Sequence, residues 1–142
     1  DIAKRLRKTL EKRGVTFYMQ SAVKQILSPA ESGQEYTTVV FDKKGKEDRI
    51  DTDLVLIATG RQANFDNIGI ESTGIEVNAK GIVVNDNMET NVKGVYAIGD
   101  VNARQMLAHA ATFQGFRAVN HILGKDDNIR LDIMPSAIFT YP

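Results

Sequence analysis

The residue best suited to chemistry in this sequence is a carboxylate that directly follows an apolar run. Residues 94–98 form the run, and Gly99 and Asp100 come next. This pattern predicts a buried strand that ends in a loop, and α/β proteins bind ligands at that edge of the sheet. Because an ionised carboxylate only accepts hydrogen bonds, Asp100 is suited to binding sugar or polyol hydroxyls. Gly99 would allow a ligand to approach the backbone closely.

A helix is predicted from about Met106 to Leu123, and Gly124 stops it. No strong Ser, Thr or Asp cap directly precedes Met106, so the first-turn N–H groups and the positive end of the helix dipole are free for an anion or a carbonyl. The alternative is an ordinary strand, loop and helix in which Asp100 only shapes the loop.

Other candidate sites are weaker. His109 and His121 are twelve residues apart and have no cluster of possible ligands beside them, so we expect no metal site. The Asn85-Asp86-Asn87 stretch lacks calcium-loop spacing, and a hairpin turn explains it better. Gly115 inside the predicted helix indicates close packing against a neighbouring backbone.

Composition limits the possible functions. Of the 142 residues, 42% are apolar and 25% are charged, and the 18 basic side chains balance the 18 acidic ones. No net charge attracts nucleic acid or an anionic membrane, so neither is an expected partner. The longest strongly apolar run, Leu54–Ala58, is much shorter than a membrane span. There is no cysteine, which excludes disulfides, thiolate metal sites and dithiol chemistry within this chain.

Short elements precede the candidate site. Residues 2–13 are predicted to form an amphipathic helix with Ile2, Leu6 and Leu10 on one face, and we interpret its basic outer face as solvated rather than as a polyanion site. Four β-like runs then predict a meander: Val15–Met19, Ala22–Leu27, Tyr36–Phe41 and Arg49–Ile50.

Two longer stretches complete the expected fold. The continuous apolar run Leu54–Ala58 predicts a strand covered on both faces. Residues 62–91 are expected to form a loop with one hairpin. The core-facing residues expected on the second helix are Leu107, Ala110, Ala111, Ala118, Val119 and Ile122.

Four motifs, in this order and spacing, carry a resemblance to a known family. They are Ala58-Thr-Gly-Arg61 with Asn64, Thr90-Asn-Val-Lys-Gly-Val-Tyr-Ala-Ile-Gly-Asp-Val101, Met106-Leu-Ala-His-Ala-Ala111 with Gly115, and Pro135-Ser-Ala-Ile-Phe-Thr-Tyr-Pro142. The sequence resembles the pyridine-nucleotide disulfide oxidoreductases, flavoproteins that pass electrons between a nicotinamide, FAD and a cysteine pair. Met-Leu-Ala-His-Ala is most similar to the dihydrolipoamide dehydrogenase branch, and a sibling reductase for another disulfide or small molecule is the alternative.

The resemblance implies roles for individual residues. Asp100 would bind the ribityl portion of FAD, and Met106, Leu107, Ala108 and His109 would line the flavin through the first turn of the helix. Such a helix N-terminus would stabilise the negative charge of a reduced flavin. For His109 this role belongs to its position and backbone, and the alternative is an ordinary surface residue.

The resemblance also implies contacts with NAD. Gly60 matches a position at the dinucleotide site where the strand end approaches the cofactor. Val23 aligns with a contact on the adenosine side, and a half-buried strand valine is an equally good interpretation. Arg61 could face a phosphate or form a structural ion pair, and the sequence leaves both open.

Several features of complete family members are absent. The chain has no G-x-G-x-x-G fingerprint, no redox cysteine pair and no full interface domain. We therefore expect a fragment of α/β class: a truncated NAD-binding, Rossmann-like domain end with a β-meander (1–60), a central FAD-contacting segment (61–133) and the start of an interface domain (134–142).

The fragment alone is expected to be inactive and to contain no catalytic residue. The parent is expected to use FAD and NAD, to act on lipoyl-bearing proteins of 2-oxoacid dehydrogenase complexes, and to lie in the cytoplasm, or in the mitochondrial matrix of a eukaryote. Uncovered strand edges predict a homodimer or a swapped assembly. A stand-alone nucleotide-binding module is the alternative from another class.

Overall fold

The computed structural model describes residues 1–140, so Tyr141 and Pro142 of the last motif lie outside the described residues. The chain divides into two compact units, Asp1–Ala58 and a second that begins at Thr59. The assignment of the three domain segments stays a prediction.

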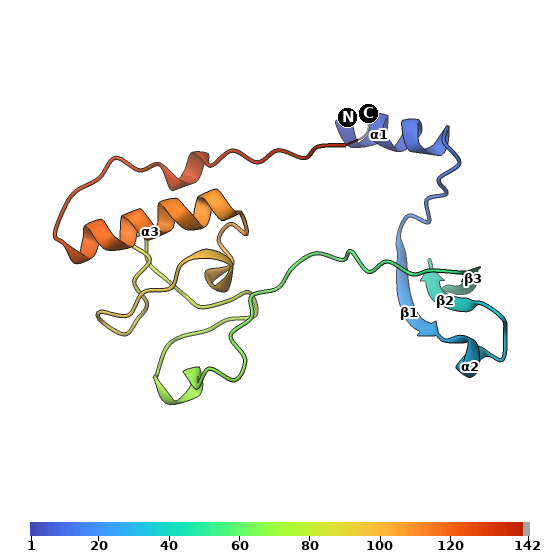
Figure 1. The fold of residues 1–142 in the computed structure, drawn as a ribbon, viewed down its shortest axis with the longest axis horizontal. Coiled ribbons are helices and arrows are strands. Elements are labelled where there is room, and N and C mark those ends of the chain that lie inside the picture. Colours follow the sequence, from blue (N-terminus) through green and yellow to red (C-terminus); the bar gives the residue numbers. More distant parts are fainter. Residues whose placement is uncertain (141–142) are drawn as a thin grey trace. The chain divides into compact units, whose positions relative to one another are not determined.

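The first unit contains a helix and a three-stranded antiparallel sheet in the order β1-β2-β3 (Figure 1). Its elements are α1 (Ile2–Glu11), β1 (Ser21–Leu27), α2 (Pro29–Ser32), β2 (Thr37–Lys43) and β3 (Lys46–Thr52). Lys44 and Gly45 both have positive φ angles, as the tightest hairpin turns require. The central strand β2 supplies the buried residues Thr38, Val40 and Phe41, and the predicted meander is confirmed from β1 to β3.

Two predictions in this unit are wrong. Residues 15–19 form no strand, and neither does the apolar run Leu54–Ala58. Leu56 is 89% exposed, so this run is not covered on both faces. The physical reason is that no segment among residues 1–140 pairs with it, and an apolar run becomes a buried strand only where neighbouring strands supply hydrogen bonds. The apolar face of α1 is likewise unburied.

The second unit is built mostly from turns and one long helix. Its elements are the 3₁₀ turns η1 (Ile70–Ser72), η2 (Gly99–Asn102) and η3 (Leu131–Ile133), and the helix α3 (Ala108–Ile122). Ile70, Ile82 and Ala97 form the buried cluster, and partly buried apolar side chains pack around it. Figure 1 shows α3 beside the loops that lead into it.

Two loops of this unit confirm turn predictions. Val77 and Ile82 form an isolated antiparallel bridge, which is the expected hairpin. The Asn85 side chain accepts hydrogen bonds from the backbone N–H groups of Asn87 and Glu89, so this stretch is a turn. Residues 94–98, by contrast, form no strand: Tyr96 makes a single bridge to Glu89, because a turn closed by the Val95 N–H and the Val92 carbonyl precedes it and η2 follows from Gly99.

Helix α3 starts two residues later than predicted, and its buried face differs from the expected one. Ala110 and Ala118 are buried as predicted, but Val119 and Ile122 are exposed. The buried stripe instead includes Gln114, which lies four residues from each alanine. No helix among residues 1–140 has both the length and the apolarity needed to cross a membrane.

Candidate functional site

Asp100 lies on the η2 turn, where its carboxylate is accessible. Its side chain is 42% exposed, and one oxygen lies 3.4 Å from a guanidinium nitrogen of Arg61. This ion pair is one of the two alternatives that the sequence gave for Arg61, and a guanidinium this exposed can still contact a phosphate. An exposed pair of this kind adds little stability, so Asp100 remains available to accept hydrogen bonds.

Gly99 was expected to allow a ligand close to the backbone, but its near neighbour in the structure is α3. Its φ of +75° favours glycine, and a Cβ there would lie 3.3 Å from the Cβ of Ala111. The close neighbour of Gly99 is therefore the first part of α3. This contact brings the Asp100 turn beside the N-terminal end of α3.

The N-terminus of α3 has free donors, as predicted. Leu107 is its N-cap residue, and no side chain caps the helix. The Ala111 N–H already bonds to the Leu107 carbonyl, so the N–H groups of Ala108, His109 and Ala110 have no partner within the helix. Met106 and Leu107 precede the helix in extended or loop conformation instead of forming its first turn.

The imidazole of His109 is held in place by the C-terminal segment. Its Nε2 lies 2.8 Å from the carbonyl oxygen of Pro135. Because a carbonyl only accepts, Nε2 carries the proton and the ring donates this bond. His109 is therefore a link between the start of α3 and residue 135, and within the described residues its side chain is not part of any metal cluster.

Arg61, the ion-pair partner of Asp100, lines a shallow groove. It has a volume of about 400 Å³ and is lined by Arg61, Gln62, Ala79, Lys80, Ala103 and Met106. Two of these side chains are cations, which suits an anionic ligand. Met106 brings the start of α3 into the same wall, so the predicted residues Asp100 and Met106–His109 do come together in one region.

The predicted nicotinamide residues, Gly60 and Val23, belong to different units. Gly60 has a φ of +108°, and a Cβ there would meet no atom within 4 Å, so the backbone requires glycine while the space above it is open. Val23 belongs to the first unit and is 62% exposed. It lies beside a bulge on β1, which pairs only with β2 in the described sheet.

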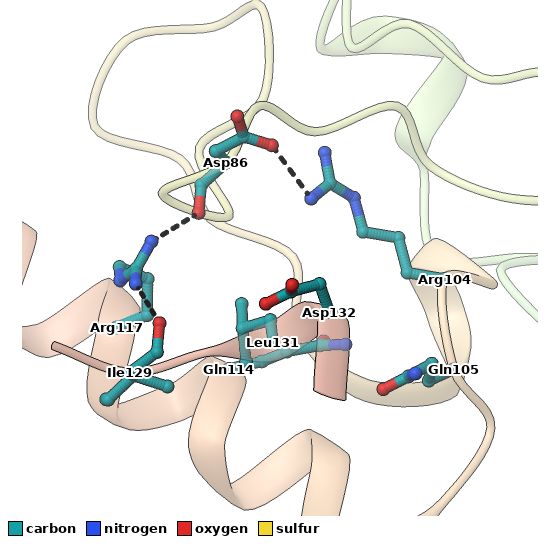
Figure 2. Close-up of a pocket in the computed structure, with 8 residues that line it drawn as sticks. All are labelled: Asp86, Arg104, Gln105, Gln114, Arg117, Ile129, Leu131 and Asp132. Atoms are coloured by element: carbon teal, nitrogen blue, oxygen red, sulfur yellow. Dashed lines mark hydrogen bonds and ion pairs between the residues drawn. The ribbon is translucent and has the colours of Figure 1, made fainter. Parts of the chain in front are cut away.

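A second cavity was not predicted from the sequence. It has a volume of about 440 Å³, and Figure 2 shows the eight residues that line it: Asp86, Arg104, Gln105, Gln114, Arg117, Ile129, Leu131 and Asp132. Arg104 donates to the Asp86 carboxylate, and Arg117 donates to the carbonyls of Asp86 and Ile129. A hydrogen bond from Arg130 lowers the pKa of Asp132 to about 2, so Asp132 is an anion at neutral pH. The two aspartates of the wall therefore balance its two arginines.

Arg117 also anchors the end of α3. Its Nε donates to both oxygens of Asp127, at 2.8 and 3.0 Å. Burial raises the pKa of the Asp127 carboxyl, but hydrogen bonds from the Ile129 N–H, from Asn120 and from Arg117 outweigh burial and hold it below its usual value. Asp127 is therefore an anion at neutral pH.

Sequence reasoning missed two buried polar residues next to Asp100. Asn102 and Gln114 are both buried, and the Asn102 amide nitrogen donates to the Gln114 side-chain oxygen at 2.8 Å. The spacing of Gln114 between Ala110 and Ala118 was the available signal, since a polar residue in a buried helical stripe needs a partner.

The comparisons with known proteins identify the family. Residues 1–115 match the model of the pyridine nucleotide-disulphide oxidoreductases, and the chain belongs to this family. Members of this family are oxidoreductases, and the family implies flavin and nicotinamide cofactors.

Individual relatives are dihydrolipoyl dehydrogenases and similar reductases. The chain is 34% identical to dihydrolipoyl dehydrogenase 2, mitochondrial, of Arabidopsis thaliana, over 100% of this chain and 28% of the relative. It is also 34% identical to a dihydrolipoyl dehydrogenase of Bacillus subtilis (100% and 30%) and to leghemoglobin reductase of Glycine max (100% and 27%). The chain thus spans less than a third of the length of these relatives.

A solved structure supports the fold. The bacillithiol disulfide reductase Bdr (YpdA) from Staphylococcus aureus superposes with a TM-score of 0.52 and 22% identity, over 85% of this chain and 43% of that one. This likeness is consistent with the predicted α/β class and a truncated Rossmann-like fragment.

Proposed function

We propose that this chain supplies one wall of the FAD site, and part of the NAD site, of a dihydrolipoyl dehydrogenase. The observation that carries the proposal is the juxtaposition of the accessible Asp100 carboxylate with the uncapped N-terminus of α3. The 34% identity to dihydrolipoyl dehydrogenases over the whole chain supports the branch of the family.

The residues present fit FAD. The Asp100 carboxylate would accept hydrogen bonds from the ribityl hydroxyls. The N–H groups of the exposed residues Ala108 and His109 would donate to the electron-rich edge of the flavin, and Met106 and Leu107 would line it. Bound FAD supplies the two-electron carrier between the nicotinamide and a disulfide, whereas this chain's residues bind, orient and polarise it.

The rest of the reaction needs groups that this chain lacks. It has no cysteine, so the redox-active thiols belong to another part of the parent. By extension we propose that the fragment alone is inactive. The parent acts on lipoyl-bearing proteins of 2-oxoacid dehydrogenase complexes, as a homodimer, in the cytoplasm or the mitochondrial matrix. Gly60 and Val23 are proposed contacts of NAD.

A titration of the purified chain with FAD, followed by flavin fluorescence, tests the flavin site. We expect saturable binding, and Asp100→Ala should raise Kd about tenfold or more, because a hydrogen bond to a charged group contributes about 1.5–3 kcal/mol. Asp66→Ala is the matched control, since Asp66 is another exposed aspartate of the same unit. Equal affinities for the two variants would refute the role of Asp100.

One observation favours a sibling enzyme as the second candidate. Leghemoglobin reductase matches with the same 34% identity as the dihydrolipoyl dehydrogenases, so identity alone does not select the substrate. Turnover of dihydrolipoamide with NAD+ by the parent protein distinguishes the two: activity supports the first proposal, and its absence with an intact flavin favours the sibling.

A further inference from the structure

One buried side-chain oxygen holds both ends of the turn that carries Asp100. Gln114 is only 2% exposed. Its Oε1 accepts the Gly99 N–H at 2.7 Å and the Asn102 side-chain amide at 2.8 Å. Gly99 and Asn102 are the first and last residues of η2, so Asp100 lies between the two groups that Gln114 fixes.

Asn102 extends this support on both sides of the turn. Its amide nitrogen also donates to the carbonyl of Ala97 at 2.9 Å, and its side-chain oxygen accepts the Arg104 N–H at 3.0 Å. Buried hydrogen bonds of this kind are costly to break, because each group left without a partner is desolvated. The backbone from Ala97 to Arg104 is thus tied to α3 through Gln114.

The two ends of the Gln114 amide have different surroundings. A carbonyl-type oxygen accepts two hydrogen bonds, and Oε1 has both. The amide nitrogen donates to no group among residues 1–140, and Gln114 lines the cavity of Figure 2. Within the described residues, the side-chain oxygen of Gln114 is therefore the atom that holds the η2 turn.

We propose that Gln114 is a positioning residue of the flavin site: its side-chain oxygen sets the place of the Asp100 carboxylate relative to the N-terminus of α3. This inference rests on the proposed function, and it makes a chemical prediction. Gln114→Glu retains the acceptor oxygen in either protonation state, whereas Gln114→Met keeps the length of the side chain and removes the acceptor.

Amide hydrogen exchange of the complete 142-residue chain tests the inference without any flavin. In the wild type, the Gly99 N–H should exchange slowly although it lies outside α3. We expect Gln114→Met to accelerate its exchange at least tenfold and to shift the carboxyl ¹³C resonance of Asp100, and Gln114→Glu to stay within about threefold of the wild type.

A titration with FAD then connects the turn to binding. Gln114→Met should raise Kd at least fivefold, and Gln114→Glu should restore it to within twofold. Arg117→Leu is the control, because it loosens the same helix from Asp127 without touching the turn. It should lower Tm and leave Kd unchanged.

Fast exchange of the Gly99 N–H in the wild type would overturn the inference. So would a loss of FAD affinity in Gln114→Glu as large as in Gln114→Met, or an unchanged Kd for FAD in Gln114→Met. A rise of Kd in Arg117→Leu equal to that in Gln114→Met would also overturn it. If Gln114→Met does not fold, the wild-type exchange and the Gln114→Glu variant still decide. If the wild type binds no FAD, the proposed flavin site fails by itself, and the exchange results alone decide whether Gln114 places Asp100.

Discussion

Gly81 is the position where the smallest substitution should have the largest local effect. A Cβ added there would lie 2.5 Å from the carbonyl oxygen of Val101, 3.1 Å from the carbonyl carbon of Asn102 and 3.2 Å from the Cβ of Ala63. The Val101 oxygen also accepts the Ile82 N–H at 2.9 Å. Two of the three neighbours are backbone atoms, so Gly81→Ala requires the η2 turn to move.

The expected cost follows from two opposing effects. Forcing a methyl group into a packed site costs about 1–3 kcal/mol. Alanine restricts the unfolded chain more than glycine does, which returns about 0.4–1 kcal/mol, and the φ of Gly81 lies outside the region that favours glycine. We therefore expect Gly81→Ala to destabilise the second unit by about 1–2 kcal/mol, or roughly tenfold in the unfolding equilibrium.

Gly115→Ala is the matched control and should have the opposite sign. A Cβ at Gly115 would lie 3.5 Å from the Cδ1 of Ile98, which is ordinary contact. The neighbour is a side chain, so the expectation that a backbone packs against Gly115 is wrong. Because alanine is favoured over glycine inside a helix by about 1 kcal/mol, this variant should be more stable by roughly 0.5–1 kcal/mol.

Urea denaturation followed by circular dichroism at 222 nm measures both variants. Exchange of the Ile82 N–H gives a local reading, because its acceptor is the displaced Val101 carbonyl. The midpoint should fall for Gly81→Ala and rise for Gly115→Ala, with faster Ile82 exchange only in the first. The packing argument would be refuted if Gly81→Ala had the urea midpoint of the wild type. It would also be refuted if the midpoint fell while the exchange of the Ile82 N–H, in the second unit, stayed unchanged.

Two other residues give independent tests. Met88 is completely buried, so Met88→Ala should destabilise the second unit by about 2–5 kcal/mol; a Tm within one degree of the wild type would contradict this. Asp127 has a depressed pKa in the folded state, so its stabilisation is complete above the unfolded-state pKa of about 3.9 and is lost as the pH falls through the folded value. Asp127→Asn should lower Tm at pH 7 and weaken the loss of stability below pH 4, and an unchanged acid profile in thermal melts would exclude this role.

Local patterns predicted much of the fold. The spacing of Ile2, Leu6 and Leu10 predicted α1, the β-branched run at Thr37–Val40 predicted the central strand, and Gly124 marked the end of α3. In each case the signal lies within one element, because helical periodicity, β-propensity and a positive-φ residue depend on nearby positions.

The failures depend on partners that a linear pattern does not reveal. Leu54–Ala58 is apolar enough for a covered strand, yet a strand needs neighbours that accept and donate its backbone hydrogen bonds. Residues 94–98 have the same apolar character, but only Tyr96 finds a bridging partner. Val119 and Ile122 are apolar, but the buried face of α3 carries Ala110, Gln114 and Ala118 instead.

In the candidate site too, local features were predicted and contacts between distant residues were not. The sequence predicted an accessible carboxylate and an uncapped helix start, because a Gly-Asp pair and a missing cap are local features. It did not predict how they are held, because the bonds from Gln114 to Gly99 and Asn102 span 15 and 12 residues. A buried side-chain oxygen in a stripe of alanines is tolerated only when hydrogen-bond donors reach it. In this chain that requirement is met by the turn that carries the carboxylate, so the polar residue least explained by the helix pattern is the one that joins the helix to the site.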